Sequence, residues 1–228
     1  MIATARIQSI GSAPARSLLF LAAGILIATG LFLTAQGGWI YAKAALAQVL
    51  LERAFAESVT SGLPVKPWSW ADTWPVARIE VPRLGVSAIA LNGASGQALA
   101  FGPGHLDNTP EAGEEGTAVY AAHRDTHFTF LRNIKENDQI RITRRDGRIF
   151  TFRVTHMAVA RWDEAEIDPD ARGVHLVLAT CFPFDAVTSG PLRYLVYADL
   201  EESAAPFQNR TTNAERRRFP ARSGNERA

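Results

Sequence analysis

The chain has 228 residues, enough for one domain of ordinary size with extensions, and a formal net charge of only +1. With so little net charge, the composition gives no reason to expect nucleic acid as a partner. A single cysteine, Cys181, excludes an intramolecular disulfide and a cysteine-rich zinc site. This thiol is therefore either buried and inert or reactive, and the residues around it have to distinguish the two.

An uncharged, apolar run covers residues 17–35. At about 1.5 Å per residue, a helix of this length crosses most of a hydrocarbon core of about 30 Å. Arg6 and Arg16 precede the run. Trp39 and Tyr41 follow it, at the depth where aromatic rings favour the lipid–water interface. Because the run is long for a signal peptide and no small-x-small cleavage site follows it, we expect an uncleaved signal anchor.

The rest of the chain divides into segments of different composition. Basic residues on the short N-terminal side predict that residues 1–16 lie in the cytoplasm and that the remainder lies outside it. Residues 36–73 predict a juxtamembrane helix rich in Ala and Leu, and then a linker with Gly and Pro. Residues 74–201 form the expected folded domain. Residues 202–228 are polar without apolar periodicity, which predicts a disordered tail.

The folded region is predicted to consist mainly of short strands. The candidate strands are residues 77–81, 86–91, 117–122, 139–144, 148–154, 174–179 and 192–199. Asp146-Gly147 is a strong signal for a hairpin with a type I′ turn, which needs positive φ at its centre. One helical turn is expected at residues 129–135. Several short strands with few helices predict an all-β barrel or sandwich.

Three ends of these strands carry groups whose chemistry fits together. Cys181 follows the buried strand 174–179, and Phe182-Pro183 ends that strand. His123 ends another strand, and Arg193 begins a third. They offer a nucleophile, an imidazole for proton transfer and a fixed cation for an oxyanion. Most domains of this size hold a Cys, a His and an Arg, so the residue types alone leave structural roles open.

Three segments resemble the signature regions of the sortase family, in the family's order. They are Ala122-His123-Arg124-Asp125, Leu178-Ala179-Thr180-Cys181 and Leu192-Arg193-Tyr194-Leu195. The resemblance covers about residues 74–200. The extended segment at residues 123–128 is most similar to the single sortase of Gram-negative proteobacteria.

The chain departs from the family pattern at two positions. Val177 stands where members usually have Thr, so one polar contact is lost or replaced there, and Ala122 stands where Gly is frequent. We expect both changes to leave activity in place.

The resemblance implies an eight-stranded β-barrel and a two-step acyl transfer. Cys181 would attack a backbone carbonyl in a Leu-Pro-x-Thr-Gly-like sorting motif of an exported protein. Arg193 would stabilise the oxyanion, and His123 would protonate the leaving amine and deprotonate the incoming one. The resemblance implies no cofactor and no metal. It implies three partners, namely the exported protein, an amine acceptor that is a cell envelope component or a protein, and the lipid bilayer. It places the catalytic domain on the periplasmic side of the inner membrane.

Three further residues are candidates for substrate binding. Thr180 can orient substrate or Arg193, although a hydroxyl bonded to the backbone is an equal alternative. His105 follows a Gly-Pro-Gly loop, where lining the groove competes with a structural loop role. Asp125 lies in the polar loop after His123.

Two other functions compete with the sortase interpretation. One is an L,D-transpeptidase-like peptidoglycan enzyme, whose Ser-x-Gly-Cys pattern and adjacent Arg are absent from Ala179-Thr180-Cys181-Phe182. The other is a non-catalytic, membrane-tethered β-barrel that binds peptide and keeps Cys181 as a core thiol. Reactivity of the folded thiol toward a small alkylating reagent distinguishes the non-catalytic alternative from an enzyme.

Overall fold

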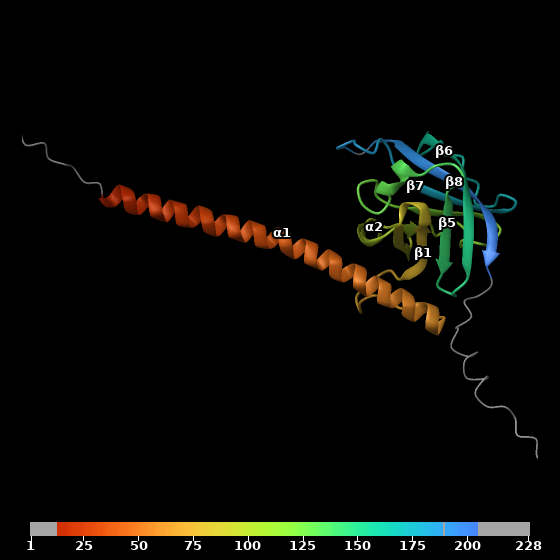
Figure 1. Ribbon diagram of the computed structural model, residues 1–228, viewed down its shortest axis with the longest axis horizontal. Helices are drawn as coiled ribbons and strands as arrows, with labels where there is room; N and C mark the ends of the chain where they lie inside the picture. Colours follow the sequence, from red (N-terminus) through yellow and green to blue (C-terminus); the bar gives the residue numbers. More distant parts are fainter. Residues whose placement is uncertain (1–12, 189, 205–228) are drawn as a thin grey trace, which may run out of the picture. The chain divides into compact units, whose positions relative to one another are not determined.

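The computed structural model describes residues 13–188 and 190–204. The chain divides into two compact units, Met1–Ala47 and Gln48–Ala228. A single helix, α1 (Ala13–Ser61), begins in the first unit and ends in the second, as Figure 1 shows. The predicted membrane segment and the predicted juxtamembrane helix are therefore parts of one continuous helix.

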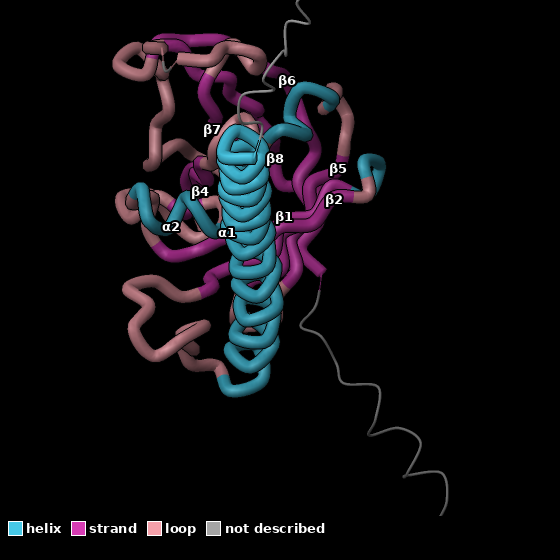
Figure 2. The backbone as a smooth tube through the Cα atoms, turned by 90° about the vertical axis from the view of Figure 1, so that its left-hand side faces the viewer, coloured by secondary structure: helices cyan, strands magenta, loops and turns pink. Residues whose placement is uncertain are grey.

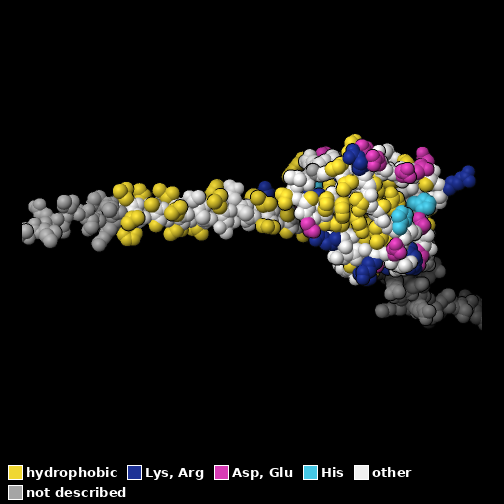
Figure 3. All heavy atoms as spheres, turned by 90° about the horizontal axis from the view of Figure 1, so that it is seen from above, with side chains coloured by type: hydrophobic (Ala, Val, Ile, Leu, Met, Phe, Trp, Pro, Cys, Tyr) yellow, Lys and Arg dark blue, Asp and Glu magenta, His cyan; other side chains and the backbone are white. Residues whose placement is uncertain are grey.

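The uncharged part of α1, residues 17–35, is apolar on all sides. Large side chains from Leu18 to Leu33 are exposed there, and they are visible as the apolar stretch of the helix in Figure 3. A helix that is apolar all round suits hydrocarbon rather than water. By length and composition, this helix could span a membrane.

The C-terminal part of α1 belongs to the second unit and packs on the barrel. Leu51 and Phe55 are buried in a small cluster with residues of β2 (Val86–Asn92) and α2 (Gly96–Phe101). Gln48 Nε2 also donates to the Phe101 carbonyl at 2.8 Å. The end of α1 is therefore attached to the folded domain by both apolar burial and a hydrogen bond.

Eight strands close into a barrel in the order β1-β2-β3-β4-β7-β8-β6-β5. Figure 2 separates these strands from the short helical connections. The other strands are β1 (Pro75–Val81), β3 (Gly104–His105), β4 (Gly116–Ala121), β5 (Gln139–Arg144), β6 (Ile149–Arg161), β7 (Val174–Cys181) and β8 (Leu192–Ala204). Two 3₁₀ turns, η1 (Pro82–Leu84) and η2 (Thr129–Asn133), complete the unit. The predicted all-β barrel is confirmed.

Successive side chains of β7 point to opposite faces of the barrel wall. Leu176 and Leu178 point into the main core, while Val177 lies in a second cluster with apolar residues of β4 and β8. Ala165 and Ile167, from the loop between β6 and β7, pack against that second cluster. The outer face of β4, β7 and β8 is therefore apolar and partly covered by a loop.

The predicted hairpin is present, but its turn type is not the predicted one. A type I′ turn needs positive φ at both central residues, and only Gly147 has it here, at 79°. The Gly147 N–H donates to the Arg144 carbonyl, and Arg144 and Arg148 pair beyond it. This is a three-residue loop closed by a left-handed glycine.

Several elements differ from their predicted bounds. β3 and α2 were not predicted, and β6 extends to Arg161 because it keeps pairing with β8 along its whole length. β8 continues to Ala204, into the segment predicted as tail. The rest of that predicted tail, residues 205–228, lies outside the described residues.

Candidate active site

Sheet register brings the three predicted reactive groups to one level. Cys181 ends β7 and lies directly opposite Arg193 in the antiparallel β7–β8 pair. β4 runs parallel to β7 with Ala121 opposite Ala179, and the Ala122 N–H still donates to the Ala179 carbonyl at 3.2 Å. His123 therefore follows β4 at the level that Cys181 occupies on β7. The site spans three adjacent strands.

All three side chains line one groove on the outer face of the sheet, with a cavity volume of about 320 Å³. Its floor is the apolar surface of β4, β7 and β8, and one wall is the β6–β7 loop with Trp162, Ala165 and Ile167. The other residues that line it are Leu99, Leu106, Val119, Ala121, Ala122, Ala179, Thr180 and Leu195. Such a groove suits an extended, largely apolar peptide next to one reactive end.

The described part of the groove lining holds few ionisable side chains, and no carboxylate is among them. Among the described residues that line it, Cys181, His123 and Arg193 are the ionisable ones, and none is acidic. Arg193 places a fixed cation opposite the cysteine. The same cation can stabilise negative charge that develops on a carbonyl oxygen.

Arg193 is held by its own strand end. Its Nη1 donates to the Gly190 and Leu192 carbonyls, both at 2.9 Å. The Phe182 N–H donates to the Leu192 carbonyl at 3.0 Å, which closes the base of the β7–β8 loop beside Cys181. The side chain of Arg193 is therefore oriented from one nitrogen, and the rest of the guanidinium remains for the groove.

The three predicted substrate-binding residues have different places. Thr180 lines the groove, but it is buried and its hydroxyl donates to the Ala122 carbonyl at 2.7 Å. His105 ends β3 and is buried, with Nε2 at 2.9 Å from the Pro110 carbonyl, and it is not among the groove residues. Asp125 is exposed and is not among the groove residues.

His127 lies beside the site and connects it to α2. Burial lowers the pKa of His127 below its ordinary value, and the neighbouring His123 acts in the same direction. A hydrogen bond with the Ala100 backbone opposes that shift. His127 is therefore favoured as a neutral imidazole beside His123.

Sequence reasoning missed the residues that give the groove its walls. Leu99, Leu106 and Ile167 come from a short helix and two loops, where no strand or helix periodicity marks a buried side. Trp162 directly follows β6 and is 64% exposed, and the predicted strand at residues 148–154 ended too early to point to it.

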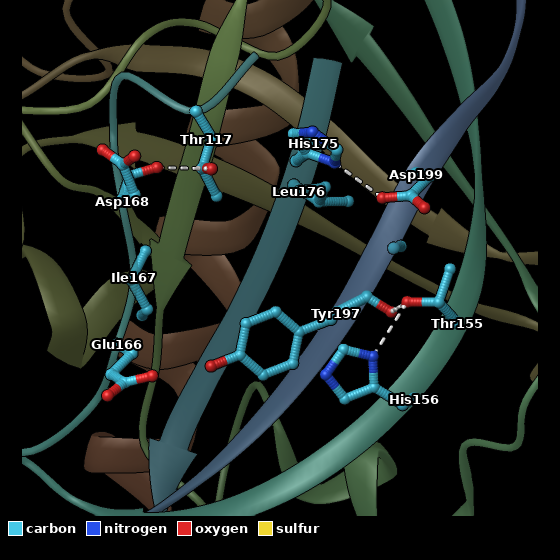
Figure 4. Close-up of a pocket in the computed structure, with 12 residues that line it drawn as sticks. Thr117, Thr155, His156, Glu166, Ile167, Asp168, His175, Leu176, Tyr197 and Asp199 are labelled. Carbon is cyan, nitrogen blue, oxygen red and sulfur yellow. Dashed lines mark hydrogen bonds and ion pairs between the residues drawn. The ribbon is translucent and has the colours of Figure 1, made fainter. Parts of the chain in front are cut away.

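A second cavity, of about 410 Å³, lies on the other side of the β6–β7 loop (Figure 4). In it, His175 contacts the Asp199 carboxylate at 2.6 Å, and the His156 ring stacks on Tyr197 at 4.4 Å. The carbonyl of Arg172, and then Asp199, raise the pKa of His175. The described residues hold no group of His, Cys, Asp or Glu side chains suited to a metal ion.

Comparisons with known proteins agree with this geometry. The sortase domain family model matches residues 79–201. Sortase D of Bacillus subtilis (strain 168) is 28% identical over 120 residues, which are 52% of this chain and 60% of that protein. The chain therefore spans about 60% of the length of this curated relative.

Solved structures show the same fold. A sortase D5 transpeptidase from Clostridium perfringens superposes with a TM-score of 0.55 at 21% identity, covering 69% of this chain and 99% of that one. Sortase A from Corynebacterium diphtheriae, a lid mutant, gives a TM-score of 0.52 at 25% identity, with 69% and 95% covered. With a family model that covers more than half of its length and a closed eight-stranded barrel of the same fold, this chain belongs to the sortase family.

Proposed function

We propose that this chain is a membrane-anchored cysteine transpeptidase that cleaves a Leu-Pro-x-Thr-Gly-like sorting motif and joins the exported protein to an amine acceptor. One observation carries the proposal. Cys181 and Arg193 face each other in register, and His123 follows the parallel neighbouring strand into the same groove.

The first step is attack of the Cys181 thiolate on the scissile carbonyl. Arg193 stabilises the oxyanion of the tetrahedral intermediate from the opposite strand. His123 donates a proton to the leaving amine, so the peptide bond breaks as the thioester forms. The C-terminal piece of the sorting signal leaves, and the N-terminal piece stays on sulfur.

The second step reverses the proton transfer. His123 takes a proton from the acceptor amine, which attacks the thioester and releases the Cys181 thiolate. The apolar floor and loop wall of the groove limit the water that can reach the thioester, which supports aminolysis over hydrolysis. The Thr180 hydroxyl donates to the Ala122 carbonyl, and this hydrogen bond fixes the backbone immediately before His123.

The proposal extends to the location of the chain. The uncharged part of α1 at residues 17–35 spans the inner membrane, residues 1–16 stay in the cytoplasm, and the domain at residues 74–201 faces the periplasm. The segment at residues 123–128 supports membership of the single-sortase group of Gram-negative proteobacteria. An anchored enzyme meets membrane-bound substrates at a high effective concentration.

Trapping the acyl-enzyme tests the proposal. The full chain in native membranes is quenched in acid, digested, and the peptide that contains Cys181 is examined by mass spectrometry. We expect a hydroxylamine-sensitive adduct that ends in a motif residue, and none in the Cys181→Ala variant. A Cys181 that carries no adduct and resists a small alkylating reagent in the folded chain would instead support the peptide-binding alternative.

A further inference from the structure

Arg124, the residue after His123, contacts the loop that joins the other two reactive residues. Its Nη2 donates to the Ala186 carbonyl at 2.6 Å and to the Thr188 carbonyl at 3.0 Å. Both carbonyls lie between Cys181, which ends β7, and Arg193, near the start of β8. One guanidinium therefore connects the end of β4 to the β7–β8 loop.

Arg124 binds the loop through the backbone of the loop alone. Both of its hydrogen bonds go to backbone carbonyls, and its Nη1 is buried with no partner among the residues that the structure describes. A buried donor without a partner lowers the stability of a fold. Arg124 itself is not among the residues that line the groove.

The β7–β8 loop also determines where Arg193 points. Nη1 of Arg193 is bound to the carbonyl of Gly190 in this loop and to the carbonyl of Leu192 at the start of β8, so a shift of the loop changes one of the two contacts that orient the guanidinium. Arg124 holds the same loop two residues before Gly190, at Thr188. A movement of the loop away from β4 would therefore change the place of Arg193 relative to Cys181 and His123.

A second arginine provides an internal comparison. Arg132 on η2 reaches the same loop through an ion pair of 3.3 Å with Asp185 and through the ring of Phe184. The Asp185 side chain is 89% exposed, and exposed ion pairs of this kind contribute little. Arg132 therefore offers a matched arginine whose loss should leave the loop in place.

We propose that Arg124 is a positioning residue that fixes the β7–β8 loop, and through it Arg193, against the strand end that carries His123. The inference rests on the proposed function, because it concerns the geometry of that same site. Misplacing a reacting or stabilising group by about 1 Å can cost about 100-fold in rate. Loss of Arg124 should therefore lower the rate of acylation while the groove still binds peptide.

The test measures single-turnover acylation of Cys181 by a Leu-Pro-x-Thr-Gly-type peptide, using the full chain in lipid nanodiscs. We expect Arg124→Gln to lower the acylation rate constant about 10- to 100-fold with little change in KM. The acylation rate constant of Arg132→Gln should stay within about threefold of that of the unmodified chain, because the ion pair between Arg132 and Asp185 is exposed. Thermal unfolding of each variant shows whether the fold is retained.

A double-mutant cycle separates positioning from a merely structural effect. If Arg124 acts through Arg193, then Arg124→Gln should cost little in an Arg193→Lys background, so the two losses should not add. Additive losses, or an Arg124→Gln chain that acylates at the unmodified rate, would overturn the inference while leaving the proposed function intact. An unmodified chain that forms no thioester would overturn both.

Discussion

Replacing Arg193 by lysine tests the proposed oxyanion role most directly. Arg193 divides its guanidinium between two tasks: Nη1 holds the Gly190 and Leu192 carbonyls at 2.9 Å, and the remaining nitrogens are left for the groove. Arg193→Lys keeps the positive charge but offers one nitrogen. A single ammonium nitrogen cannot bind the Gly190 and Leu192 carbonyls and also reach an oxyanion at Cys181. The charge survives, but one of the two functions is lost.

The expected size of the effect follows from that count of donors. Loss of one oxyanion donor typically costs about 100- to 1,000-fold in rate, or about 2.7–4 kcal/mol. Peptide binding depends mainly on the apolar floor and the loop wall of the groove, which the substitution leaves unchanged. We therefore expect the acylation rate constant of Arg193→Lys to fall by that factor, with KM changed by less than about threefold.

Rapid-quench mass spectrometry of the acyl-enzyme measures the rate constant directly. Arg161→Lys is the control, because Arg161 is exposed at the end of β6 and pairs with Asp163 outside the groove. That control should acylate at the rate of the unmodified chain. If Arg193→Lys forms the thioester within about threefold of that rate, a planar fork is not needed at this position and the oxyanion assignment is wrong.

Three other predictions concern the imidazoles and the core. His123→Ala should lower turnover about 100- to 10,000-fold, whereas His127→Ala should lose less than tenfold; equal losses in the same peptide assay would mean that the general acid is misassigned. The Arg172 carbonyl, and then Asp199, raise the pKa of His175. The contribution of charged His175 to the stability of the fold is therefore fully present below about pH 6.5, and it declines as pH rises through the raised pKa. Thermal unfolding from pH 6 upward should therefore show a decline that Asp199→Asn reduces, and an unchanged slope would contradict the assignment. Phe152 is fully buried, so Phe152→Ala should lower the free energy of unfolding in urea by about 3–5 kcal/mol, and a loss below about 1 kcal/mol would contradict its place in the core.

The strands were predictable where burial alternates cleanly. Residues 139–144 alternate buried and exposed side chains in the barrel, and the glycine-containing turn after them sits where the sequence placed it. The turn type could not be predicted, because the loop length depends on which residues pair across it. β3 has only two residues and is held by long-range pairing with β2 and β4, so it has no local pattern to detect.

The candidate site was predictable at strand ends and not between them. The order and types of His123, Cys181 and Arg193 suggested one chemistry, but only the parallel pairing of β4 and β7 aligns two of them. The groove walls come from α2 and from loops whose packing depends on distant strands. For His105, the sequence could not distinguish a groove residue from a structural one. Its position after a glycine-containing segment did not indicate that the ring would be buried beside Tyr120.

The parallel pairing of β4 and β7 has a consequence for how much change the chain can tolerate. Thr180 and Ala122 are 58 positions apart in sequence, yet their hydrogen bond joins the two strand ends that precede Cys181 and His123. The segment between His123 and Cys181 includes the hairpin that turns at Gly147, and that hairpin contributes neither the imidazole nor the thiol. A small domain inserted at that turn should leave the spacing of thiol and imidazole unchanged. A change of length at this turn should therefore leave the reactive pair in register.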